Sequence, residues 1–188
     1  MSSTSNMNLN LNTQFDQKLR AYFECPEDAN TYVKQLEELS EKTLSSKMLA
    51  KLHGRLGMHL LFLNKYEQAK NQLAKSLKII EENSLDLQLK VQQQIRWATL
   101  LQWEGKYYEA DILFLKLIEV CNKKENCHHY LDFCYQHYGK SLFEQEKYNQ
   151  ALEYLRKALE LRKIKDNKEL IESTEMAIQR IRTITPCK

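Results

Sequence analysis

The feature that most constrains the fold is an internal repeat with a step of 41 residues. A tyrosine stands at Tyr66, Tyr107 and Tyr148, and the residues around it recur with the same step. The recurring small residues are Gly57, Ala98 and Gly139 before the tyrosines and Ala69, Ala110 and Ala151 after them. Repeats of 20 to 50 residues or so are typical of solenoids, in which each unit stacks only on its neighbours.

Each copy has the pattern of two amphipathic helices joined by a tight turn. Apolar residues recur at i, i+3, i+4 and i+7 on both sides of the turn, and small residues are needed where two helices cross closely. The turns fall at Asn64, Gly105 and Glu146. Glycine suits a left-handed turn residue best and asparagine next, so Glu146 is the least favourable. The prolines at positions 26 and 186 leave the stretch between them free of helix breakers, which favours an all-α chain.

The order of small and large residues in each copy resembles the tetratricopeptide repeat. The third copy matches best and ends Ala158-Leu159-Glu160-Leu161, although Lys163 replaces the proline that usually closes the repeat. The family's usual period is about 34 residues, and the longer step here corresponds to about one extra turn in each helix. A long-helix variant of the family therefore fits best. Armadillo and HEAT repeats share the longer period and are the second choice, because they lack the Gly/Ala–Tyr–Ala spacing.

The resemblance covers about residues 47–164 and implies a right-handed α-solenoid of three helical hairpins. The expected repeats are 47–83, 86–124 and 127–164, with helices at 47–63, 66–82, 86–104, 107–123, 127–145 and 148–164. Ser45 or Ser46 can cap the first helix and Ser84 the third. Asp166 and Glu169 resemble a capping box that opens a C-terminal capping helix within 167–183.

The N-terminal part lacks the repeat pattern. Thr13–Phe23 and Pro26–Thr43 read as two helices, and Pro26 fits a first helical position. We expect residues 13–44 to form a degenerate repeat or an N-terminal cap of a single domain, 13–188. The Ser- and Asn-rich residues 1–12 are expected to be disordered.

In the tetratricopeptide family the first helix of each pair lines a concave groove. By position, the expected partner-binding residues are Lys51, Arg55, Met58, Phe62, Gln92, Arg96, Thr99, Trp103, Phe133, His137 and Lys140. Arg55, Arg96 and His137 would form a basic ladder. Arginine pairs with carboxylates and aromatic residues anchor interfaces, so this groove suits a segment with acidic and apolar side chains. The competing interpretation is a solvated charged face with Phe62 and Trp103 buried between repeats.

The resemblance implies a non-catalytic protein- or peptide-binding adaptor or scaffold. The alternative is a structural subunit or dedicated escort of a partner protein, possibly a homodimer through residues 13–43. The residues with which some tetratricopeptide repeats grip the C-terminal carboxylate of cytosolic chaperones are absent.

We expect no metal, cofactor or catalytic site. Possible zinc ligands gather at Cys121, Cys127, His128, His129 and Cys134, but they lack a C-x2-C pair. Cys121 and Cys134 fall on helices and could equally be core residues. A nucleophile pair of Cys134 and His137 has little support, and Glu144 and Glu146 read as solvated or turn residues.

The charge and the termini point to a cytoplasmic protein. The formal net charge of +3 does not support nucleic-acid binding. A signal peptide and an apolar membrane-spanning run are both missing from the sequence. The five cysteines are therefore expected to be reduced thiols.

Overall fold

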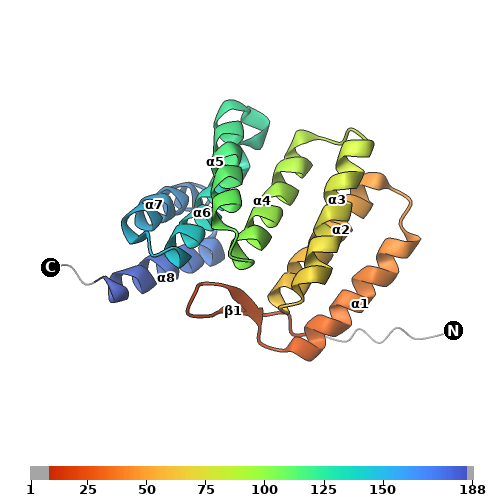
Figure 1. Ribbon diagram of the computed structural model, residues 1–188, viewed down its shortest axis with the longest axis horizontal. Coiled ribbons are helices and arrows are strands. Elements are labelled where there is room, and N and C mark those ends of the chain that lie inside the picture. Colours follow the sequence, from red (N-terminus) through yellow and green to blue (C-terminus); the bar gives the residue numbers. More distant parts are fainter. Residues whose placement is uncertain (1–8, 186–188) are drawn as a thin grey trace.

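The computed structural model describes residues 9–185, which form an all-α solenoid with one small β-hairpin (Figure 1). The helices are α1 Pro26–Lys42, α2 Ser46–Phe62, α3 Tyr66–Glu82, α4 Leu87–Trp103, α5 Tyr107–Lys123, the 3₁₀ helix η1 Glu125–Tyr130, α6 Leu131–Glu144, α7 Tyr148–Ile164 and α8 Lys168–Ile184. The pairs α2–α3, α4–α5 and α6–α7 are the three predicted helical hairpins, with α1 packed on α2 and α8 on α7. No helix in this part of the chain has the length and apolar character needed to cross a membrane.

The repeated small residues allow the two helices of a pair to meet closely. A Cβ atom added at Gly57 would lie 2.5 Å from Leu73 Cγ, and one at Gly139 would lie 2.8 Å from Leu155 Cγ. Both distances are shorter than carbon atoms tolerate, so any larger side chain would push the helices apart. The sequence-based reason for these glycines is confirmed.

The turns within the pairs have the left-handed conformation that the sequence predicts. The φ angles are 59° at Asn64, 77° at Gly105 and 60° at Glu146. Only glycine adopts this conformation without a steric penalty from its side chain. Glu146 is therefore the strained member of the three, in agreement with the sequence.

Two of the predicted helix caps are wrong by one or two residues. The side chain of Asp86, not Ser84, caps α4 by accepting from the backbone N–H of Leu89. Asn167, not Asp166, caps α8 by accepting from Leu170 N–H. Ser84 and Asp166 have φ angles of 48° and 51° and close the preceding helix instead. The predicted cap at Ser45 is confirmed.

The predicted helix 127–145 is shorter than expected. The 3₁₀ helix η1 takes up residues 125–130, and α6 begins only at Leu131. The backbone N–H of Cys127 bonds to the carbonyl of Lys124, which starts this tighter turn. As a result, Tyr130 projects from η1 rather than from the first turn of α6.

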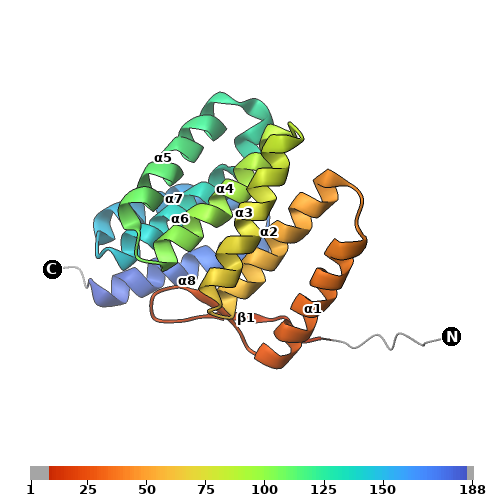
Figure 2. The same ribbon diagram turned by 45° about the vertical axis from the view of Figure 1, so that its right-hand side comes forward.

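The prediction of a helix at Thr13–Phe23 is wrong. Strands β1 Thr13–Phe15 and β2 Ala21–Phe23 pair antiparallel, with Thr13 opposite Phe23. The Asp16 carboxylate closes the turn by accepting from the backbone N–H groups of Lys18 and Arg20, both at 2.8 Å. In both views the hairpin runs from the start of α1 beneath α4 towards α8 (Figures 1 and 2).

The residues just before the hairpin also differ from the prediction of a disordered segment. The carbonyl of Asn12 accepts from Glu24 N–H and so prolongs the hairpin ladder. Asn10 N–H donates to the carboxylate of Asp28 at 2.8 Å, which ties this stretch to α1. Residues 1–8 of the predicted disordered segment lie outside the described part of the chain.

Candidate partner-binding groove

Helices α2, α4 and α6 lie side by side and carry equivalent residues at the repeat step. Two rows of these residues organise the groove. We call Phe62, Trp103 and Glu144 the hairpin row, and Arg55, Arg96 and His137 the arginine row. The sequence predicted that Phe62, Trp103 and the whole arginine row would face the partner, and that Glu144 would be a solvated or turn residue.

The β-hairpin covers the hairpin row. Phe23 packs against Phe62 with ring centroids 5.7 Å apart, and Phe62 stacks on Trp103 at 5.9 Å. The guanidinium of Arg20 lies over the Trp103 ring at 5.4 Å. Trp103 is only 8% exposed as a result. The competing expectation of a buried Trp103 is therefore correct, although the hairpin contributes to the cover as well as the repeats.

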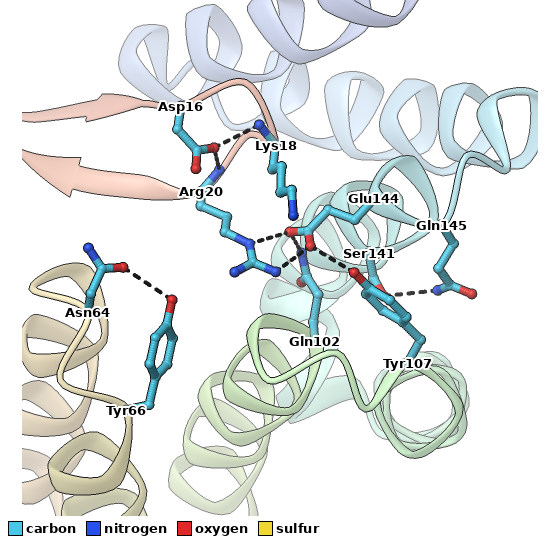
Figure 3. Close-up of polar contacts among 10 residues, drawn as sticks. All are labelled: Asp16, Lys18, Arg20, Asn64, Tyr66, Gln102, Tyr107, Ser141, Glu144 and Gln145. Carbon is cyan, nitrogen blue, oxygen red and sulfur yellow. Dashed lines mark hydrogen bonds and ion pairs between the residues drawn. The ribbon is translucent and has the colours of Figure 1, made fainter.

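Glu144 holds the hairpin in place (Figure 3). Its carboxylate accepts from Arg20 Nε at 2.9 Å and Nη2 at 2.6 Å, and also from Gln102 Nε2 at 2.7 Å and the Tyr107 hydroxyl at 3.2 Å. Its side chain is fully buried, so the expectation of a solvated Glu144 is wrong. Burial acts to lower the pKa of Arg20, but the hydrogen bonds and charge of Glu144 raise it above its usual value.

Arg96 and His137 of the arginine row line an open cavity of about 290 Å³. Seven of the predicted partner-binding residues line this cavity: Met58, Phe62, Gln92, Arg96, Thr99, Phe133 and His137. The sequence missed two further lining residues, Ile95 and Tyr130. Tyr130 could not be found from the repeat pattern because it comes from η1, which interrupts that pattern.

Arg96 carries a positive charge that the described chain does not neutralise. Its Nη1 donates to Gln93 Oε1 at 2.9 Å, and it forms no ion pair within residues 9–185. Burial, and then the nearby charge of Arg55, lower the pKa of Arg96 to about 10, so the guanidinium remains charged at neutral pH. The bare backbone of Gly54 makes room for it, since a Cβ there would lie 2.6 Å from Arg96 Nη1.

The other two members of the arginine row differ from the predicted basic ladder. Arg55 is exposed, donates to the Tyr32 hydroxyl and lies over that ring at 5.6 Å. His137 Nδ1 meets the Thr99 hydroxyl at 3.1 Å. Burial, and then the charge of Lys140, lower the pKa of His137 to about 3. The imidazole is therefore neutral at pH 7, and the ladder has two cationic members instead of three.

The remaining predicted residues do not line the open cavity. Lys51 is exposed. Lys140 is 9% exposed and lies beneath the hairpin, where its ammonium faces the Phe15 ring at 3.9 Å. Most of the predicted partner-binding residues therefore fall into two groups. Seven line the open cavity, whereas Trp103 and Lys140 lie under the hairpin.

The cysteines belong to the core between α5, η1 and α6. Cys121, Cys127 and Cys134 are fully buried, whereas His128 and His129 are exposed. Within residues 9–185 no group of three potential metal ligands comes together. A hydrogen bond with Cys121 and burial raise the pKa of the Cys134 thiol, which disfavours the thiolate that a nucleophile requires.

Comparisons with known proteins agree with this architecture. Sequence models of the tetratricopeptide repeat match residues 50–83 and 94–164. The chain belongs to the tetratricopeptide repeat family. Tetratricopeptide repeats form concave surfaces that bind other proteins, and this chain is a protein-interaction module in that general sense.

Several solved structures have a similar fold. The crystal structure of the apo form of RapI superimposes with a TM-score of 0.65 at 18% sequence identity. The match covers 86% of this tetratricopeptide repeat protein and 58% of RapI, so the chain spans little more than half of that protein. At this identity the likeness concerns the fold alone. No curated protein matches the chain in sequence.

Proposed function

We propose that this tetratricopeptide repeat protein is a non-catalytic adaptor whose open groove binds a partner segment with acidic and apolar side chains. The observation that carries the proposal is the guanidinium of Arg96 at the wall of the open cavity, which has no counter-ion within residues 9–185. A partly buried charge without a counter-ion is unfavourable in the free protein. A carboxylate from a partner would form charge-assisted hydrogen bonds with it, which are among the strongest polar contacts in proteins.

The surroundings of Arg96 favour apolar side chains next to that carboxylate. Met58, Phe62, Phe133 and Tyr130 line the same cavity. Aromatic residues and methionine are enriched at protein interfaces because they bury much apolar area. A cavity that combines one cation with several apolar side chains suits a segment that combines acidic and apolar residues.

The test uses a fluorescein-labelled octapeptide that alternates Glu and Leu, with a Gln/Leu octapeptide as its uncharged counterpart. Fluorescence anisotropy should show binding of the acidic peptide that weakens with added salt. Arg96→Gln should weaken binding roughly tenfold or more, because it removes a charge-assisted contact. Arg156→Gln, which removes an exposed arginine on α7, is the matched control. Equal binding of both peptides would contradict the proposal.

A structural or escort role is the second proposal, and it rests on a different surface. Large apolar side chains are exposed around the connection between α1 and α2, with Leu39 at 50%, Leu44 at 100% and Met48 at 51%. Such a patch is typical of contacts with another chain. This role predicts a dimer that Leu39→Ser with Leu44→Ser converts to a monomer in light scattering. A monomeric wild-type protein would count against it.

A further inference from the structure

A second cavity of about 180 Å³ lies between the hairpin and the groove. Phe15 and Leu19 of the hairpin and Gln136 and Lys140 of α6 are among its lining residues. It shares Phe62, Thr99, Phe133 and His137 with the open cavity. The two cavities are therefore neighbours along one groove, and we call the second one the covered cavity.

Gln136 is the first unusual feature of the covered cavity. Its side chain is 3% exposed, yet neither Oε1 nor Nε2 has a hydrogen-bond partner within the described chain. Buried polar groups are nearly always paired, and leaving one unpaired lowers stability. A leucine or methionine at this position would fill similar space without that penalty. The glutamine is therefore explained best by a group that binds to it.

Lys140 is the second unusual feature, and it lies one helical turn beyond Gln136. It is 9% exposed and forms no ion pair within residues 9–185. Burial, and then the charge of Arg162, lower its pKa to about 7, while Asp16 acts in the opposite direction. Arg162 itself is neutralised by Asp132, with Nε to Oδ2 at 3.1 Å. The covered cavity thus offers an ammonium group that lacks an anion.

We propose that the covered cavity is a second subsite that binds a carboxylate of the partner segment between the Gln136 amide and the Lys140 ammonium. The inference rests on the proposed function of the groove. Gln136 Nε2 and Lys140 Nζ donate to the carboxylate, and Gln136 Oε1 accepts an N–H of the segment. Hairpin residues line one side of the subsite, and the four shared residues connect it to the open cavity. It belongs either to an acidic side chain or to the C-terminus of the segment.

The experiment compares Gln136→Met and Lys140→Met with wild type and with Arg156→Gln. Both variants remove the polar group; Gln136→Met keeps the length of the side chain, and Lys140→Met shortens it by one atom. We expect each to raise the melting temperature and also to weaken binding of the Glu/Leu octapeptide about tenfold. A merely structural role would not produce higher stability together with weaker binding. Octapeptides with free and amidated C-termini separate the two sources, since amidation weakens binding only if the terminal carboxylate occupies the subsite.

The outcomes separate this inference from the proposed function. Binding that Arg96→Gln weakens but both methionine variants leave unchanged would overturn the covered subsite and leave the open groove as the binding site. Binding that the methionine variants weaken and Arg96→Gln does not would support the subsite and overturn the role of Arg96. Wild-type protein that does not bind the acidic octapeptide would overturn both. Because two independent variants test the subsite, misfolding of one leaves the other to decide.

Discussion

The hairpin row and the arginine row come from the same three helices and the same repeat step, two helical turns apart. In the hairpin row the carboxylate of Glu144 is fully buried and receives four hydrogen bonds, two of them from Arg20. In the arginine row Arg96 is partly buried, and within the described residues its guanidinium donates only to the uncharged Gln93 amide. The contrast teaches that burial of a charged residue does not mark a binding site. What distinguishes the two rows is whether the chain supplies the counter-ion itself.

Breaking the contact between the hairpin and Glu144 should have the largest effect on stability. Arg20→Ala would leave the Glu144 carboxylate buried without its cation, and we expect the free energy of unfolding to fall by about 3 kcal/mol. Urea unfolding measures this. Lys123→Ala breaks an exposed pair with Glu119 and should leave stability unchanged.

The fluorescence of Trp103 gives an independent check on Arg20→Ala. In a Trp97→Phe background Trp103 is the remaining tryptophan. Its quenching by acrylamide should increase when the hairpin detaches, because the hairpin now covers it. Unchanged quenching and unchanged stability would mean that the two rows do not differ as the contrast requires.

The pH dependence of stability extends the comparison to Lys140. This residue lies under the hairpin, as Arg20 and Glu144 do, but within residues 9–185 it has no counter-ion, as is also the case for Arg96. The pKa of Lys140 is about 7 in the folded protein and 10.5 in the unfolded chain. Between these values the unfolded chain binds more protons, so this residue makes wild-type stability rise with pH. Lys140→Met should therefore stabilise the protein by about 3 kcal/mol more near pH 6 than near pH 9. A stability difference that is the same at both pH values would show that the ammonium is well solvated.

Gly54→Ala in α2 should have the smallest effect on stability, and Gly57→Ala in the same helix serves for comparison. A methyl group at Gly54 would displace Gln93 and Arg96, whereas one at Gly57 would strike Leu73 in the core. Gly54→Ala should lower stability by about 1 kcal/mol, because the gain in helix propensity offsets part of the cost of displacing the buried Gln93 side chain. It should nonetheless weaken binding of the acidic octapeptide severalfold. Gly57→Ala should instead destabilise the fold by about 1–3 kcal/mol, and the opposite pattern would contradict the placement of Arg96.

The repeat helices could be predicted because their signals are local. The step between Tyr66, Tyr107 and Tyr148 coincides with the starts of α3, α5 and α7. The hairpin could not, since Phe15, Leu19 and Phe23 have a spacing that suits a helix face. Their actual conformation depends on the side-chain turn at Asp16 and on contacts with the groove. Tertiary contacts override local propensity in such short segments.

The sequence predicted which helices line the groove, but not that the hairpin covers one part of it. Seven of the residues selected from the repeat pattern line the open cavity, because equivalent helix positions face the same way. It could not show that Arg20 would reach Glu144, or that Gln136 would be buried without a partner. The sequence gives no sign that Glu144 and Gln136 are buried, since a polar residue on an amphipathic helix is normally interpreted as facing solvent.

The contact between Arg20 and Glu144 joins residues 124 positions apart in the chain. Solenoids usually unfold in steps, because each repeat touches only its neighbours and an end can fray while the middle persists. Here the N-terminal β-hairpin is fastened to the third helical hairpin, so neither end of the described chain can unfold without breaking contacts of the other. The hairpin thereby converts an open stack into a closed loop of interactions, and we expect the whole chain to unfold as a single cooperative unit.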